Sequence, residues 1–474
     1  MTTSTGSTDS EKQDAHGKSR MLHPVAMMLL IMLVAIGLTY ILDSGQFQRH
    51  AKLVIPGTYQ LIAKERDLTA LLAASPPVSS AERAYPASLF SAMAAIPAGL
   101  AKSAPLVFMI MFIGGMFGVL RKSGALDAGI DRLLVRTGGN VYLLTPVLML
   151  AIAAGSTFLG LISEYLVIIP MMLILAQRLG LGPLYATALV AIAAKIGYLA
   201  SVTNPLALVI AQPIVQVPLL SGAGLRLFVF VLFLAIGIAY LLLYVKRHGY
   251  TLPAELNQDN RLSLSHRFVL MVVGISVIVQ VIGTSEWKWG DIQLGAFYIF
   301  EGIIIAIAAG MSVRTACDAF VEGMKGMMLA GLLIGLAKAI EIVLHDSLVL
   351  DTVIYHLASI VEGRSKIFAA EGMILVQMLL DVLIPSTSGK AAISMPILGP
   401  IGHLSGVSGQ SVVLAFLFGN GLTNMITPTS GMLLAYLATG KVGYGTWIRF
   451  IFPLFAIFTV LAMAVMAFAV YSGY

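Results

Sequence analysis

Long apolar runs restrict this chain to folds that span a membrane. Val25–Leu42, Leu225–Val245 and Ile448–Val470 each have the length and apolarity of a membrane-spanning helix. The whole chain is 58% hydrophobic and only 11% charged, and its mean hydropathy is +0.92. These values exclude an ordinary soluble globular protein. Because lipid cannot satisfy backbone polar groups, we expect an all-α, polytopic membrane protein.

The charged residues fit the same class. The net charge of +6 is explained by Lys and Arg in short cytoplasmic loops, which set topology, so no nucleic-acid partner is expected. A single cysteine, Cys317, excludes an intramolecular disulfide. Residues 1–20 are polar and predict a disordered cytoplasmic tail. Val25–Leu42 is long and lacks a small-residue cleavage site, so we expect it to remain as the first span.

A polar heptapeptide interrupts the second half of the chain. Ile384–Lys390 (IPSTSGK) lies between Ile367–Val382 and Ala391–Leu404, which are both too short to cross a bilayer comfortably. Non-helical backbone at membrane depth must face protein or water. The pattern therefore predicts a re-entrant helical hairpin over 367–404, with a tip that presents hydroxyls and backbone groups to a small solute.

The first half contains a similar pattern. Gly155–Gly160 (GSTFLG) separates two short apolar arms and predicts a hairpin over 141–179. Each predicted hairpin is followed by an apolar segment that polar residues and a proline interrupt. These interruptions are Ser201–Pro205, within 184–211, and Thr427–Gly431, within 412–439. Proline with Ser, Thr and Asn inside an apolar segment predicts a broken helix.

The two patterns form an internal repeat. Ser123–Ile130 matches Ser347–Ile354, 224 residues further along, and Asn204-Pro205 matches Thr427-Pro428, 223 residues further along. We therefore divide the chain into a first half at 21–246, a cytoplasmic linker at 247–267 and a second half at 268–474. Inverted repeats with discontinuous helices are typical of secondary transporters. Single Ser, Thr, Gly or Pro residues are also tolerated at helix contacts, but four interruptions at matching places favour the transporter.

The basic clusters orient the chain. Arg121, Lys122, Arg132 and Arg136 follow one span, and Lys246 and Arg247 follow another. The positive-inside rule then places the N-terminus in the cytoplasm and the C-terminus in the periplasm, with the two hairpins entering from opposite sides. Residues 43–102 are expected outside the membrane. Ser312–Gly326 is predicted to be a short inner stretch, separate from the span at Met327–Leu344.

Helix ends at the tips and breaks leave backbone N–H and C=O groups free. Helix N-termini suit an anion such as a carboxylate, and carbonyls with hydroxyls suit Na⁺, the only metal ion expected. The predicted substrate-binding residues are Ser156, Thr157, Glu164, Asn204, Ser386, Thr387, Ser388, Lys390, Asn424 and Thr427. The predicted residues for a coupling ion, Na⁺ or H⁺, are Ser156, Thr203, Asn204, Ser386, Thr427, Thr429, Glu164 and Lys195.

Ionisable residues at membrane depth are costly and therefore mark functional sites. Glu164 carries a coupling proton or holds an ammonium group, unless backbone N–H groups at the tip satisfy it. Lys390 meets a substrate carboxylate or extends outward to the interface. Lys195 replaces a bound cation, pairs with Glu164, or lies nearer the inner interface. Lys338 and Glu341, spaced i and i+3, are expected to pair with each other, and Asp381 is a weaker candidate.

Three stretches resemble the YfcC-like branch of the DcuC-type C4-dicarboxylate carriers, within the ion-transporter superfamily. They are Thr203–Gln212, Ile384–Ala392, and Pro428–Gly431 followed by Val442–Trp447. The resemblance implies an inverted-repeat fold with a scaffold and a mobile transport domain, elevator-like movement, a homodimer, and coupling to Na⁺ or H⁺. Arginine/ornithine antiporters resemble this branch too. The branch has two adjacent glutamates after the first tip, whereas this chain has Ser163-Glu164 there, and Lys195 is atypical.

Other classes of function fit less well. No His-Glu-x-x-His pattern or nucleophile–base pairing supports an intramembrane enzyme, and no Walker-type loop supports an ATP-driven pump. A channel needs a continuous pore, whereas two facing tips close a site from one side at a time. We therefore expect a secondary active transporter in the bacterial inner membrane. Its substrate is a small carboxylate-bearing metabolite, either a C4-dicarboxylate or an amino acid, with a basic amino acid antiporter as the alternative.

Overall fold

The computed structural model describes residues 23–50, 53–74, 77–251 and 263–474. The predicted tail at 1–20 and residues 252–262 of the predicted linker lie outside these ranges. The described chain is mostly helical. Eight of its helices are long and apolar enough to cross a membrane, which agrees with the polytopic class predicted from the sequence.

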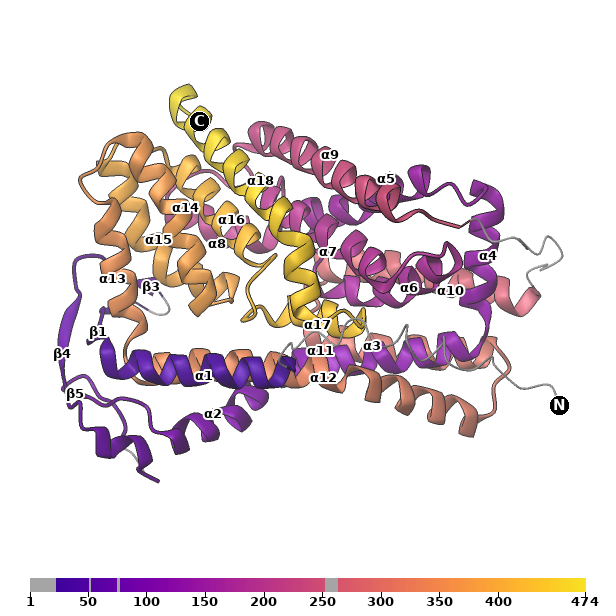
Figure 1. The fold of residues 1–474 in the computed structure, drawn as a ribbon, viewed down its shortest axis with the longest axis horizontal. Coiled ribbons are helices and arrows are strands. Elements are labelled where there is room, and N and C mark those ends of the chain that lie inside the picture. The colour runs from indigo at the N-terminus through magenta and orange to yellow at the C-terminus, as the bar shows by residue number, and fades with distance from the viewer. Residues whose placement is uncertain (1–22, 51–52, 75–76, 252–262) are drawn as a thin grey trace, which may run out of the picture.

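One group of helices forms a bundle around a long helix, α12. Its members are α1 (Pro24–Ile41), α2 (Leu89–Lys102), α3 (Ala104–Lys122), α10 (Leu264–Ser285), α11 (Asp291–Ala308) and α12 (Val313–Asp346). Helix α12 packs along α1, α2 and α3, and α11 packs on α3 (Figure 1). We call this group the scaffold bundle.

The predicted separation of Ser312–Gly326 from the span after it is wrong, because α12 is one continuous helix over both. The glycines in this region serve close packing instead of ending the helix. A Cβ on Gly323 would lie 2.0 Å from the carbonyl oxygen of Gly114 in α3. Glycine therefore allows the two helices to approach with their backbones nearly touching.

A short β region precedes α2. Its strands are β1 (Ser44–Gln46), β2 (Arg49–His50), β3 (Leu53–Val54), β4 (Gln60–Lys64) and β5 (Arg83–Ala84), with a 3-10 helix at Leu68–Leu72. Strand β4 pairs antiparallel with β1 and parallel with β5, and β2 pairs antiparallel with β3. Arg49 forms an ion pair with Asp351 at 2.7 Å and so ties this region to α13 (Leu350–Val361).

The remaining helices form a second group, the core group, in which the order of elements occurs twice. The first set is α4 (Ala125–Thr137), α5 (Val141–Ala154), α6 (Ile168–Arg178), α7 (Pro183–Ala200), α8 (Pro205–Ile214) and α9 (Ala223–His248). The second set is α13, α14 (Lys366–Leu383), α15 (Thr387–Leu404), α16 (Gly409–Thr423), α17 (Gly431–Thr439) and α18 (Tyr444–Ser472). The predicted arms and breaks at 141–179, 184–211, 367–404 and 412–439 agree with these bounds to within a few residues.

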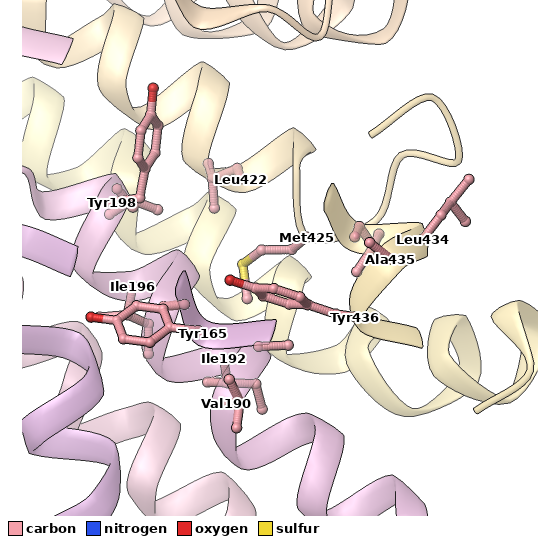
Figure 2. Close-up of a cluster of buried hydrophobic side chains, with 14 of the residues drawn as sticks. Tyr165, Val190, Ile192, Ile196, Tyr198, Leu422, Met425, Leu434, Ala435 and Tyr436 are labelled. Atoms are coloured by element: carbon pink, nitrogen blue, oxygen red, sulfur yellow. The ribbon is translucent and has the colours of Figure 1, made fainter. Parts of the chain in front are cut away.

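Helices α7 and α16 lie at the centre of the core group. In Figure 1, α5 and α6 lie at the opposite end of the molecule from α14 and α15, and α7, α8, α16 and α17 lie between them. Every residue of α7 from Tyr185 to Ala200 is buried. Apolar side chains of α7, α16 and α17 fill this centre, among them Ile192, Ile196, Leu422 and Leu434 (Figure 2).

Small polar residues cap the helices that begin at the two breaks and at the second tip. The Asn204 side chain accepts hydrogen bonds from the N–H groups of Leu206 and Ala207, and Pro205 takes the first position of α8. Ser386 accepts from Gly389 at the start of α15, and Ser430 accepts from Leu433 at the start of α17. These caps explain why the polar interruptions in the sequence mark helix N-termini in the structure.

Candidate functional site

A cavity of about 500 Å³ lies where the core group faces the scaffold bundle. We call it the central cavity. The core group lines it with Gly160, Ile162, Ser163, Glu164, Lys195, Tyr198, Leu206, Pro385, Ser386, Thr387, Asn424, Ser430, Gly431 and Met432. From the other side, helices of the scaffold bundle and Ser103, which lies between α2 and α3, line the cavity. The residues on this side are Lys102, Ser103, Pro105, Leu106, Asp291, Ile334, Ala337, Lys338 and Glu341. Residues from both tips and from the second break therefore meet at one space, and Leu206, just after the first break, also lines it.

Behind the second tip, a fully buried ion pair joins the two arms. Lys390 Nζ lies 2.8 Å from Asp381 Oδ1, and neither side chain is exposed. The other carboxylate oxygen of Asp381 accepts a hydrogen bond from Asn424 Nδ2 at 2.7 Å, and Ser430 donates to Asn424 at 2.6 Å. This chain of contacts fixes the break between α16 and α17 against the tip between α14 and α15.

A second polar cluster reaches the tip from α7. Tyr198 and Thr387 share a hydrogen bond of 2.7 Å between their hydroxyls, and Asn420 donates to both of them. Figure 2 shows the Tyr198 ring extending away from the apolar cluster around Ile192 and Ile196. The side of α7 that carries Tyr198 therefore contributes polar groups to the wall of the central cavity.

Lys195 lies one turn before Tyr198, so both residues are on the same face of α7. It is 5% exposed and lines the central cavity. Among the described residues it makes no hydrogen bond or ion pair, and Asp381 is the charged group that acts on it. Within the described residues it does not pair with Glu164, and its role for a coupling ion stays a prediction.

Glu164 lies just after the first tip, at the start of a 3-10 helix (Ser163–Val167). Its Oε2 accepts a hydrogen bond from the backbone N–H of Ile162 at 2.9 Å, as expected for a carboxylate held by the tip. It also lines the central cavity, together with Asp291 of α11. Lys338 and Glu341 form the predicted pair at 2.7 Å on the opposite wall.

The other predicted residues of the first half bond the tip to the break. Ser156 donates to the Ala194 carbonyl at 2.8 Å, and Thr157 Oγ1 accepts from the Val202 N–H at 3.0 Å. Thr203 donates to the Phe158 carbonyl at 3.1 Å. Together with the Asn204 cap, these bonds make a compact cluster behind the wall of the central cavity. Its hydroxyl and carbonyl oxygens are of the kind that binds Na⁺.

The structure gathers some predicted residues at the central cavity and separates others from it. Glu164, Lys195, Ser386, Thr387 and Asn424 line the cavity. Predicted residues outside its lining are Ser156, Thr157, Thr203, Asn204, Ser388, Lys390, Thr427 and Thr429. Lys390 neither lines the cavity nor reaches the surface in this structure, because it pairs with Asp381 between α14 and α15, and its contact with a substrate stays a prediction. Thr427 and Thr429 are buried and bond to each other at 2.8 Å.

Four functional candidates escaped the sequence analysis. Tyr198 and Asn420 each lie one turn from a predicted residue, at i+3 from Lys195 and at i−4 from Asn424, and this spacing is a signal that the sequence carries. Ser430 carries the usual signature of a helix cap before Gly431. Asp291 follows a loop, and nothing in its local sequence marks it.

Arg226 is a further buried residue that the sequence did not single out. It lies in α9, is fully buried, and donates to the carbonyls of Ser201 and Val202 at 3.1 Å each. Ser201 has a positive φ of 40°. A cation at these carbonyls satisfies the C-terminal end of α7, where the helix dipole favours positive charge.

The donor set at the tips and breaks is made of hydroxyls, amides and single charged groups. Within the described ranges, no cluster of three or more His, Cys, Asp or Glu side chains has the geometry to hold a metal ion. The arrangement suits reversible binding of a small charged solute at helix N-termini, with charged side chains of both signs on the cavity wall.

Comparisons with known proteins identify relatives over most of the chain. The profile of the DcuC family, described as C4-dicarboxylate anaerobic carrier, matches residues 21–471. A protein of Escherichia coli named putative basic amino acid antiporter YfcC is 30% identical over 394 residues, which is 78% of this chain and 78% of that protein. An uncharacterized protein of Haemophilus influenzae is 26% identical over 374 residues, or 75% of this chain and 73% of that protein.

Two solved structures were also matched. The YdaH transporter of Alcanivorax borkumensis has a TM-score of 0.46 and 16% identity, with 96% of this chain and 99% of that chain covered. MtrF of Neisseria gonorrhoeae has a TM-score of 0.44 and 16% identity, with 94% and 95% covered. These values are too low to carry an argument about this chain. The family match and the YfcC relative carry the assignment: this chain belongs to the DcuC family of membrane transporters and is YfcC-like.

Proposed function

We propose that this protein is a secondary active transporter of a small carboxylate-bearing metabolite, a C4-dicarboxylate or an amino acid, and that the central cavity is its substrate site. Transport is across the bacterial inner membrane and is coupled to Na⁺ or H⁺. The observation that carries the proposal is the meeting of both tips, the second break and the start of α8 at one cavity between two groups of helices. Discontinuous helices that meet at a shared site are the design of many secondary transporters.

The proposal includes an elevator-type movement of the core group against the scaffold bundle. In it, the arms at 141–179 and 367–404 are re-entrant hairpins of two inverted halves. Contact between the groups supports this, because α17 packs on the middle of α12 and the central cavity opens along the same boundary. The scaffold bundle then forms the interface of a homodimer and stays fixed in the membrane.

The alternative substrate is a basic amino acid. The YfcC relative is named as a putative basic amino acid antiporter. The lining of the central cavity contains two acidic residues, Glu164 and Asp291, and also Lys195 and the α15 and α17 N-termini. A basic amino acid has a cationic side chain for the acidic residues and a carboxylate for Lys195 and the helix N-termini. A dicarboxylate has no group for Glu164 and Asp291.

Uptake by proteoliposomes tests the function and the site together. Purified protein is reconstituted, and accumulation of labelled succinate and L-arginine is measured in NaCl, in choline chloride, and with preloaded substrate inside. We expect one of them to accumulate. The charge that each protein molecule moves across the membrane is expected to be far smaller than the charge that a channel would pass. If neither accumulates, even by exchange against itself, the proposed function is wrong for these substrate classes.

Two substitutions link uptake to the cavity. Glu164→Gln and Ser386→Ala are each expected to reduce uptake at least about tenfold while leaving the protein in the membrane, because each removes a polar group at the cavity wall. Ser388→Ala is the matched control, since Ser388 is exposed and outside the cavity lining. Wild-type rates in both cavity variants would contradict the site assignment.

A further inference from the structure

The charges around the second tip do not balance. Lys390 and Lys195 are both buried near Asp381, and within the described ranges Asp381 is the acidic group that acts on Lys195. Both oxygens of Asp381 are already engaged, one by Lys390 at 2.8 Å and the other by Asn424 at 2.7 Å. One carboxylate therefore faces two lysines, and this cluster retains an excess positive charge in a buried setting.

The excess charge is directed toward the central cavity. Lys390 lies behind the tip, against the ring of Phe416 at 5.2 Å, and does not line the cavity. Lys195 does line it, is 5% exposed, and has no hydrogen-bond or ion-pair partner among the described residues. A buried, unpaired ammonium group is costly, so a protein keeps one where it serves a function.

Polar donors surround the space next to Lys195. Thr387 and Tyr198 line the cavity with Lys195, and their hydroxyls share a hydrogen bond of 2.7 Å. The first residues of the helices that begin at Thr387 and Gly431 line the same cavity. The first N–H groups of a helix lack intrahelical acceptors and attract anions. Lysine, hydroxyls and two helix N-termini together are the donor set for a carboxylate.

We infer that Lys195, with Thr387 and the α15 and α17 N-termini, forms a carboxylate subsite of the central cavity, in which the bound carboxylate neutralises Lys195. This inference rests on the proposed function, because it names the group of the substrate that this wall recognises. It also assigns Lys195 to the substrate itself, whereas Lys390 belongs to the internal ion pair. The carboxylate of either substrate class fits the subsite.

A thermal-stability experiment separates binding at Lys195 from a structural role. Midpoints of thermal unfolding are measured for purified full-length protein alone, with succinate, with L-arginine, and with two analogues that lack a free carboxylate, dimethyl succinate and agmatine. For the wild type we expect a stabilising shift with at least one carboxylate probe and none with its analogue, because a ligand of the folded state raises the midpoint.

The variant Lys195→Met is expected to behave in two ways that a structural lysine would not. Its ligand-free midpoint rises, because the uncompensated buried charge is gone, and its apparent affinity for the carboxylate probe falls about 30-fold or more. Lys195→Arg keeps the charge and is expected to retain part of the ligand-induced shift. Lys325→Met is the control, because Lys325 is exposed, pairs with Glu322 and lies outside the cavity lining.

Each result decides the inference. It is overturned if no carboxylate probe shifts the wild-type midpoint, if Lys195→Met retains the shift, or if the ester and agmatine shift the wild type equally. A lowered ligand-free midpoint for Lys195→Met would likewise contradict it. Uptake by wild-type proteoliposomes with an unchanged probe affinity in Lys195→Met would refute the subsite alone, whereas probe binding that depends on Lys195 without any uptake would refute the transporter alone.

Discussion

The two tips of the core group have equivalent places in their halves but different chemistry. The first tip, residues 155–160, is held by neutral hydrogen bonds: Ser156 donates to a backbone carbonyl of α7, and Thr157 accepts from a backbone N–H of the break after it. The second tip, residues 384–386, is held by the buried pair of Asp381 and Lys390. The same framework is therefore stabilised by a neutral network in one half and by charges in the other.

This difference affects what each tip offers to the central cavity. At the first tip, the hydroxyls point inward to backbone groups, and Glu164 is the charged residue at the cavity. At the second tip and break, Ser386, Thr387 and Asn424 line the cavity, together with Lys195 of α7. The comparison predicts that changes in the second half disturb stability and substrate binding together, whereas changes to the first-half hydroxyls disturb mainly stability.

The largest effect is expected from Asp381→Asn. It leaves Lys390 and Lys195 buried without a carboxylate, so we expect a loss of about 3–5 kcal/mol of unfolding free energy and a complete loss of uptake. Thermal denaturation of purified protein and proteoliposome uptake measure the two effects. The double variant Asp381→Leu/Lys390→Met removes both charges and is expected to recover most of the lost stability. A single variant as stable as the wild type would show that the pair does not hold the second tip.

A smaller effect is expected from Thr157→Val in the first half. The substitution keeps the shape of the side chain but leaves the buried N–H of Val202 without its acceptor, which costs about 1–3 kcal/mol. Probe affinity should stay within about threefold of the wild type, because Thr157 is outside the cavity lining. Loss of affinity without loss of stability would reverse the roles assigned to the two tips.

Ser430→Ala tests how much the hydroxyl at the second break contributes to stability and to probe binding. Ser430 caps α17 and also donates to Asn424 at 2.6 Å, so we expect a loss of about 1 kcal/mol and weaker probe binding. Ser430→Thr keeps the hydroxyl and serves as the control in the same thermal and binding assays. Equal behaviour of the Ala and Thr variants would show that the cap contributes nothing measurable.

The smallest effect is expected from Glu341→Gln. Its pair with Lys338 lies within α12, and the two side chains are 20% and 30% exposed, so we expect a change below about 1 kcal/mol and near-normal uptake. The measurement is again the thermal midpoint with parallel uptake. A severe loss of uptake would move the substrate contacts from the core group to the scaffold bundle.

Local signals in the sequence predicted the positions of the helices well. Asn204 and Ser386 lie in the polar interruptions of the sequence, and each one caps an observed helix start. The incorrect division within Ser312–Asp346 arose where glycines and charged residues interrupt the apolar pattern. In the structure Gly323 permits close contact with α3, and this contact depends on a helix that is distant in the sequence.

The site was predicted less completely, for a related reason. Polar residues inside apolar segments identified Glu164, Lys195 and Ser386 as candidates, and these residues line the central cavity. The sequence could not indicate that Asp381 would take Lys390 as its partner and leave Lys195 unpaired. That outcome depends on how α7, α14 and α15 pack together, since all three residues are lone charges in apolar stretches.

We propose that substrate binds in the central cavity between the core group and the scaffold bundle. An experimental structure of the full-length protein with the transported substrate bound would test this binding site. We expect ligand density in contact with Lys195 and the Pro385–Thr387 segment, and no such density in a substrate-free sample prepared in parallel. Substrate density on a surface away from this cavity, with Lys195 still unpaired, would contradict it.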